Sequence, residues 1–212
     1  MAILLLALCE TADYGEAVDY VRLIVRMGNP VRVREDYSVL VAGKKIRYGL
    51  RRVLPASYGR VEVKGVYDNT RPMAYREETT DGSTVIFMGD RCLFPGKHRI
   101  TLEYEVYPRS DTLWLGVLNG DFPLPVDYVE VVVVPDTSEF PVVIPPKGFR
   151  EEKVQGFYVV RITGDGPFPP GERVNVGILL PSADRYARPH LLALLVAFLL
   201  VLHVLSAGLR RA

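Results

Sequence analysis

The chain has 212 residues, of which 26 are Lys or Arg and 25 are Asp or Glu, so its net charge at pH 7 is +1. This length suffices for the core of one full domain, and the even charge balance speaks against nucleic acid as a partner. Two cysteines, Cys9 and Cys92, cannot form a disulfide framework. A single glutamine and four asparagines are typical of thermophilic proteins, which avoid labile amides.

The N-terminal segment is apolar from Ala2 to Cys9 and turns polar at Glu10. This pattern predicts a signal or leader segment over residues 1–13, although the apolar run is short and no basic residue precedes it. The alternative is a first buried strand or an uncleaved anchor.

Residues 14–180 carry apolar side chains at alternate positions, as strands with one buried and one wet face do. The alternation is clear over residues 31–41, 99–106 and 173–180, whereas the nearly continuous apolar run 128–134 indicates a central strand. Turn residues at 28–30 and 81–82 predict hairpins. About nine short strands without helices predict an all-β fold, an antiparallel β-sandwich that is Ig-like in general architecture. The proline-rich residues 135–148 mark a candidate sub-boundary inside this extracytoplasmic domain.

The C-terminal segment predicts a membrane anchor. Residues 191–209 (LLALLVAFLLVLHVLSAGL) are almost wholly apolar, and a helix of this length is about 28 Å long, enough to cross a bilayer. We expect a stalk over residues 181–188, a transmembrane helix over 189–209 and a tail over 210–212. Arginines flank the helix on both sides, so the distribution of positive charge does not determine its orientation. Export by the leader would place the domain outside the cytoplasm and the C-terminus inside it.

Several strand-and-turn patterns resemble those of predicted membrane proteins that carry domain of unknown function 2207. They are residues 31–39 (VRVREDYSV), 48–55 (YGLRRVLP), 87–90 (FMGD), 95–106 (PGKHRITLEYEV), 113–116 (LWLG) and 125–135 (PVDYVEVVVVP). The chain departs from that family at Arg52, where the family has Asp, and it ends after one apolar span. The resemblance implies an extracytoplasmic β-rich domain on a membrane anchor and supplies no catalytic residues.

Two groups of residues are candidates for contact with a partner. Tyr48, Arg51 and Arg52 combine an aromatic ring and two guanidinium groups in one predicted loop, which suits an anionic glycan, a lipid headgroup or a partner's carboxylate. Trp114 and Phe122 lie near prolines and could form an exposed hot spot. The alternatives are arginines that pair with local carboxylates around a turn, and aromatic rings that belong to the core.

Three residues of the apolar C-terminal run are candidates for packing against another helix. Ala193 and Ala197 have the spacing of a small-residue contact, and His203 is the ionisable residue deep in the span. A simple anchor with one neutral histidine is the alternative.

No catalytic, cofactor-binding or metal-binding residues are predicted. The aspartates in turns (Asp81, Asp90, Asp111 and Asp121) lack the spacing of a calcium loop, and no Cys/His cluster is present. Turn aspartates usually act as local caps. Glu103 and Glu105 share one strand face, which is the geometry of paired carboxylates, but we interpret this face as a solvated one.

The sequence therefore predicts a non-enzymatic, single-pass membrane protein whose β-sandwich is an interaction or structural subunit of a cell-envelope assembly. Its expected partners are the lipid bilayer and a protein in the membrane or envelope. The alternatives are an envelope-associated hydrolase, with its site among the loop aspartates and residues 48–52, and a polysaccharide- or lipid-binding module.

Overall fold

The structure is a computed structural model that describes residues 15–89, 93–120 and 122–180. These residues form β-strands and one short 3-10 helix, η1, so the prediction of an all-β protein is confirmed. The strands are β1 (Ala17–Arg26), β2 (Val31–Val41), β3 (Leu50–Leu54), β4 (Arg60–Asp68), β5 (Arg71–Pro72), β6 (Tyr75–Thr80), β7 (Ser83–Met88), β8 (Gly96–Tyr107), β9 (Thr112–Asn119), β10 (Val126–Val134), β11 (Val143–Ile144), β12 (Arg150–Val154), β13 (Val159–Phe168) and β14 (Arg173–Leu179), with η1 at Ala56–Tyr58.

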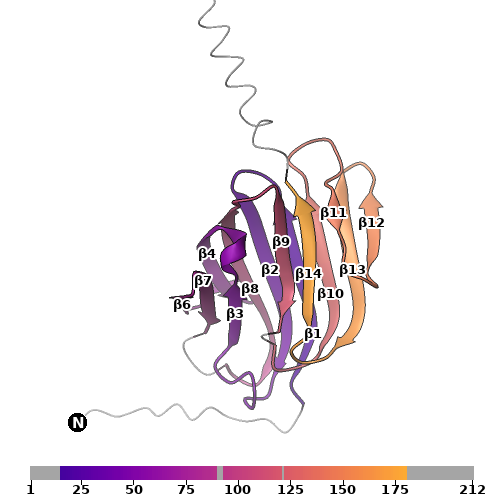
Figure 1. The fold of residues 1–212 in the computed structure, drawn as a ribbon. Coiled ribbons are helices and arrows are strands. Elements are labelled where there is room, and N and C mark those ends of the chain that lie inside the picture. The colour runs from indigo at the N-terminus through magenta and orange to yellow at the C-terminus, as the bar shows by residue number, and fades with distance from the viewer. Residues whose placement is uncertain (1–14, 90–92, 121, 181–212) are drawn as a thin grey trace, which may run out of the picture. The chain divides into compact units, whose positions relative to one another are not determined.

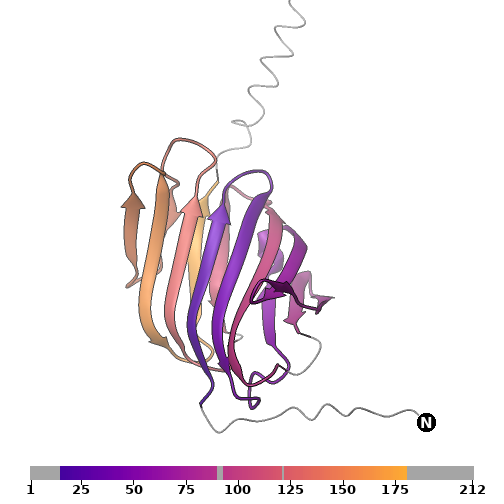
Figure 2. The same ribbon diagram turned by 180° about the vertical axis from the view of Figure 1, so that it is seen from behind.

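An eight-stranded sheet forms one layer, in the order β12-β13-β10-β1-β2-β8-β4-β5 (Figure 2). Its neighbouring strands are antiparallel with one exception, because β1 and β10 run parallel with Val21 opposite Val129. The prediction of a wholly antiparallel fold is therefore wrong at this pair. Two strands that are more than one hundred residues apart in the chain therefore lie side by side near the centre of the sheet.

The second layer consists of two three-stranded sheets, β11-β14-β9 and β3-β7-β6. Figure 1 shows β3, β9 and β14 in front of the eight-stranded sheet. Side chains from both layers fill the space between them, since alternate residues of each strand point inward. The core includes Val21, Leu23, Val33, Tyr37, Ile100, Leu102, Leu115, Val131, Ile162 and Val176, each 2% exposed or less.

Side chains rather than a backbone ladder join the two small sheets where β3 approaches β9. The Arg52 guanidinium donates to the carbonyl oxygen of Gly116, and the Asn119 amide donates to the carbonyl oxygen of Val53 at 2.6 Å. The Tyr58 hydroxyl accepts from the backbone N–H of Gly116 at 2.6 Å. Buried backbone groups need partners, and these three polar side chains supply them at this seam.

The predicted leader, stalk, transmembrane helix and tail lie outside the described residues, as do Ala193, Ala197 and His203. Within the described ranges, no helix has the length and apolar character to cross a membrane. The proline-rich stretch 135–148 contains the short strand β11. After it, β13 returns to the eight-stranded sheet beside β10 and β14 pairs with β9.

Candidate functional site

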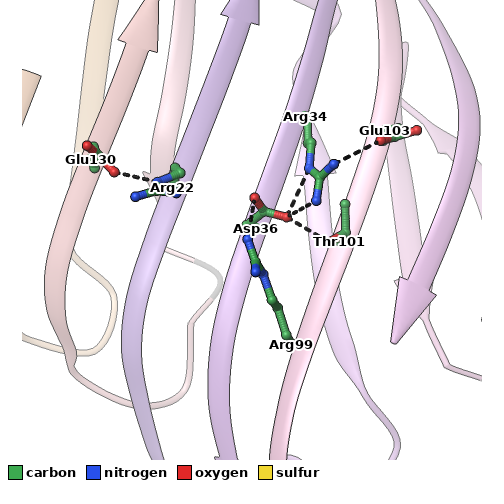
Figure 3. A network of polar contacts seen from close by, with 7 residues as sticks. All are labelled: Arg22, Arg34, Asp36, Arg99, Thr101, Glu103 and Glu130. Atoms are coloured by element: carbon green, nitrogen blue, oxygen red, sulfur yellow. Dashed lines mark hydrogen bonds and ion pairs between the residues drawn. The ribbon is translucent and has the colours of Figure 1, made fainter. Parts of the chain in front are cut away.

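The outer face of the eight-stranded sheet is the most polar, hollowed surface among the described residues. On β2, Val33, Glu35 and Tyr37 point into the core, so the residues between them point to the other side. Strand pairing places Asp36 beside Arg22 of β1 and Thr101 of β8. Figure 3 shows the resulting network of polar side chains across this face.

The carboxylate of Asp36 lies at the centre of this network. Thr101 Oγ1 donates to its Oδ1 at 2.7 Å, Arg34 Nε and Nη2 approach the same oxygen at 3.1 Å, and Arg99 Nη2 lies 3.3 Å from Oδ2. Burial alone raises the pKa of Asp36, but the Thr101 hydroxyl and the Arg34 guanidinium outweigh it, so the net pKa lies below its ordinary value. Asp36 is therefore a fixed anion that orients two arginines.

Glu130 on β10, two strands from β2, has a similar role on the same face of the sheet. It forms an ion pair with Arg22 of β1 and another with Arg161 of β13, whose Nε lies 3.0 Å from Glu130 Oε1. Only 6% of the Glu130 side chain is exposed. Charge-assisted hydrogen bonds of this kind are stronger than neutral ones, so both carboxylates hold their arginines in defined positions.

A second group of charges lies on β2, β8 and β4. Lys64 Nζ is 2.9 Å from Glu105 Oε2, and Arg32 Nε is 3.4 Å from Glu105 Oε1. The hydrogen bond to Glu105 raises the pKa of Lys64 to about 12. Arg34 Nη1 lies 3.7 Å from Glu103 Oε1, which links this group to the Asp36 network.

Three hollows follow one another along this face. The Ile24 hollow, of about 310 Å³, is lined by Ile24, Arg26, Arg32, Val33, Arg34, Lys64, Glu103, Tyr104 and Glu105. The hairpin hollow, of about 360 Å³, is lined by residues 26–30, Arg32, Val134 and Pro135. The Tyr67 hollow, of about 260 Å³, shares Arg34 and Glu103 with the first.

The Ile24 hollow lies where the neighbouring strands β1, β2, β8 and β4 supply its lining. The hollow is lined by four cationic side chains and two carboxylates, an excess of two positive charges over an apolar floor at Ile24. This arrangement suits an anionic ligand with an apolar part.

The described residues offer less for acid–base or metal chemistry. Among the described residues, no group of three or more His, Cys, Asp or Glu side chains could hold a metal ion. His98 contacts two acceptors, since Nδ1 lies 2.8 Å from Asp68 Oδ2 and Nε2 lies 2.8 Å from the carbonyl oxygen of Phe94. Both ring nitrogens of His98 are therefore engaged in local contacts, with β4 through Asp68 and with the segment before β8 through Phe94.

The structure separates the three residues that were predicted to form one contact patch, Tyr48, Arg51 and Arg52. Tyr48 is 63% exposed and Arg51 is exposed, but Arg52 is fully buried. Residues 50–54 form strand β3, so neighbouring side chains point to opposite faces. Arg52 consequently contributes to the core, and the structure does not bring the two arginines together on one surface.

Arg52 forms a buried ion pair with Glu35 of β2. Its Nε and Nη2 donate to the two carboxylate oxygens at 2.8 Å and 2.7 Å, and Glu35 also accepts from the hydroxyls of Tyr37 and Tyr104. Burial raises the pKa of both tyrosines, so they remain donors. Arg52 Nη1 is buried without a hydrogen-bond partner among the described residues. The cluster belongs to the interior and not to a surface site.

The two predicted aromatic contact residues are also separated. Phe122 is 7% exposed and packs on the ring of Tyr37, with 5.6 Å between centroids. Trp114 is 50% exposed on β9, where its ring lies over Gly177 of β14. Gly177 pairs with Trp114 on one side and with Ile144 of β11 on the other. The exposed side chains of Trp114 and Ile144 therefore lie in one row across the three strands.

The structure contains polar residues that our sequence-based predictions of sites did not include. Glu16 accepts from the backbone N–H groups of Ala42, Lys44, Lys45 and Ile46 and so fixes the loop after β2. The sequence did not single out Asp36 or Arg26 as site residues, because the alternating pattern places both on a solvated face, where charged residues are common. Glu35 had a usable signal, since it is a charged residue at an inward position of an alternating strand.

No protein-family model and no curated protein sequence matches the chain. Its fold is similar to part of yeast LTA4 hydrolase, with a TM-score of 0.51 and 11% identity over 77% of this chain and 28% of that chain. The yeast LTA4 hydrolase complex with bestatin gives a TM-score of 0.50 and 10% identity, over 78% and 29% of the two chains. An M1 zinc metallopeptidase from Deinococcus radiodurans gives 0.43 and 15% identity, over 79% and 43%.

These matches overturn the sequence-based prediction of a non-enzymatic interaction or structural subunit. Yeast LTA4 hydrolase, which contains a similar fold in part of its length, is a hydrolase. The chain spans less than a third of the length of the yeast hydrolase, and at 11% identity the likeness establishes a shared fold. The resemblance to domain of unknown function 2207 stays a prediction.

Proposed function

We propose that this chain is the β-sheet domain of a hydrolase that acts on peptides or related amides and esters, and that the outer face of the eight-stranded sheet binds the substrate. The observation that carries the proposal is the fold likeness to yeast LTA4 hydrolase over 77% of the chain. A β-sheet domain can serve such a reaction by holding parts of the substrate remote from the reacting bond, because that binding energy orients the reacting group.

The outer face has properties that support substrate binding. Its three hollows have volumes of about 260–360 Å³, close to the lower end of the range for small-molecule sites. Asp36 and Glu130 hold four arginines in place through hydrogen bonds and ion pairs. Positioned charges on a rigid sheet bind more selectively than charges on flexible loops, because less side-chain freedom is lost on binding.

We further propose that the domain is an Ig-like sandwich held at a membrane by a helix over residues 189–209, with the domain extracytoplasmic. The apolar run in the sequence supports the helix. An exposed apolar patch on the β11-β14-β9 sheet supports contact with lipid, since Trp prefers the membrane interface. The patch consists of Trp114, Val142, Ile144 and Leu179, which are 50%, 59%, 41% and 39% exposed.

The test is a hydrolysis assay on the full-length protein purified in mild detergent from its native membranes. The substrates are aminoacyl anilides, short peptides and p-nitrophenyl esters, and a tag-only preparation is the control. We expect hydrolysis that copurifies with the chain in constant ratio, and a higher KM for the outer-face variant Arg34→Gln. The Arg76→Gln variant, at an exposed position of the separate β3-β7-β6 sheet, should keep the native KM. Absence of hydrolysis above the tag-only control for every substrate would refute the proposal.

A further inference from the structure

Two arginines face each other across the first hairpin on the outer face of the large sheet. Arg26 is the last residue of β1, and the strand register places it directly opposite Arg32, the second residue of β2. Both side chains point away from the core and are exposed. Like charges at directly opposite positions of an antiparallel pair are destabilising, so this pairing has an energetic cost to the fold.

The carboxylates of the sheet neutralise one of these arginines and not the other. Arg32 has Glu105 at 3.4 Å, while 71% of its side chain remains exposed. The side chain of Arg26 has neither a hydrogen bond nor an ion pair with any other residue in the described part of the chain. The other arginines on β1, β2, β8 and β13 that point to this face each have a carboxylate within 4.0 Å: Arg22, Arg32, Arg34, Arg99 and Arg161. On these strands Arg26 is therefore the exception.

The unpaired guanidinium lies between two hollows. Arg26 and Arg32 line both the Ile24 hollow and the hairpin hollow, so a ligand in either one meets both side chains. Ile24 forms an apolar floor next to them, and Arg34 and Lys64 add positive charge on the far side. A ligand that neutralises Arg26 must carry an anionic group and can place an apolar group over Ile24.

We propose that Arg26 and Arg32 form a carboxylate-binding clamp for a small peptide or amino-acid-like ligand. A guanidinium presents parallel N–H donors that match the two oxygens of a carboxylate. The neighbouring Glu105 already occupies one side of Arg32, and the ligand's carboxylate bridges the remaining donors of Arg32 to Arg26. That this ligand is a substrate rests on the proposed function above, whereas the binding itself does not.

The clamp is tested by calorimetric titration of the full-length protein in mild detergent at low ionic strength. The probes are N-acetyl-Ala-Ala-Leu with a free C-terminal carboxylate, the same tripeptide as its C-terminal amide, and inorganic phosphate. We expect the acid to bind and the amide to bind at least about tenfold more weakly, because a charge-assisted contact is lost. Binding of the acid should also weaken as salt screens the exposed arginines.

Two variants separate the clamp from general charge effects. Arg26→Gln should weaken binding of the acid about tenfold or more and leave the amide unchanged. Arg71→Gln removes an exposed arginine at the far edge of the same sheet and should bind as the native protein does. Circular dichroism confirms folding of both variants, and Arg26→Gln should fold because Arg26 has no partner among the described residues.

The outcomes distinguish this inference from the proposed function. Equal binding of acid and amide, or native binding by Arg26→Gln, overturns the clamp. Tighter binding of phosphate than of the peptide acid overturns the assignment to a carboxylate. If the protein binds the acid in a way that depends on Arg26 but has no hydrolytic activity, the clamp is supported and only the proposed function is refuted.

Discussion

The ion pair between Glu35 and Arg52 is the interaction whose removal should affect folding most. Both side chains are fully buried, and the pair joins the large sheet to the seam between the two small ones. Burial alone lowers the pKa of Arg52, but the charge of Glu35 outweighs it and keeps the guanidinium charged. Changing Glu35→Gln removes the negative charge while its three polar neighbours remain, and Arg52→Met removes the positive one.

The structure sets the size of the effect. Removing one partner of a buried pair leaves an uncompensated charge and typically costs about 3–5 kcal/mol. This is a large part of the roughly 5–15 kcal/mol by which domains are stable. For a domain of this size, the midpoint of thermal unfolding should fall by about 2–4 °C per kcal/mol, which amounts to about 6–20 °C. Removing both charges leaves no buried ion, so the double variant should lose less than the sum of the two single losses, by about 2 kcal/mol or more.

The measurement is urea unfolding of the native protein, both single variants and the double variant, followed by circular dichroism. The neighbouring Arg51→Met variant is the matched control, because Arg51 lies on the exposed side of the same strand; its loss should stay below about 1 kcal/mol. Single losses below about 1 kcal/mol, or losses that simply add in the double variant, would show that the pair is not coupled as we infer.

Three further predictions concern other parts of the domain. The folded pKa of Asp36 is lowered, so its stabilisation is present above about pH 4 and is lost as pH falls through that pKa; acid should therefore shift urea midpoints less in Asp36→Asn than in the native protein. Glu16→Gln weakens the acceptor of the loop N–H groups, so hydrogen exchange at residues 44–46 should accelerate about tenfold. Gly177→Ala places a methyl group 3.0 Å from the Trp114 ring. The tryptophan fluorescence should therefore change, and urea unfolding should show a free energy of unfolding lower by about 1–3 kcal/mol.

The parts of the fold that could be predicted from sequence are those set by local chemistry. The turn at Asp81-Gly82 has φ values of 50° and 73°, the left-handed conformation that a two-residue hairpin needs. Alternation likewise predicted the two faces of β2, β8 and β14, although Asp36 and Ser38 on the outer face of β2 are buried. The parallel pairing of β1 with β10 could not be predicted in this way. It joins residues more than one hundred positions apart, and no local pattern carries that information.

The outer-face site was predicted only as a solvated face. Alternation shows that Arg32, Arg34 and Asp36 share a side of β2, but it does not show which strand supplies their partners. Thr101 and Arg99 reach Asp36 only because β8 lies beside β2 in one particular register. The Ile24 hollow depends on the strand order as well, since β1, β2, β8 and β4 all contribute to its lining. Such a site becomes visible when the strand order is known.

The buried cluster, in contrast, obeys a rule that sequence reasoning can use. Alternation in β3 sends Arg51 outward and Arg52 inward, and in β2 it sends Glu35 inward between Val33 and Tyr37. An inward charge is unfavourable unless an opposite inward charge faces it. Two charges of opposite sign at inward positions of two strands therefore predict that those strands face each other. The same reasoning applied to the outer face singles out Arg26, because it is a charge whose position the fold determines and whose partner, among the described residues, the fold does not supply.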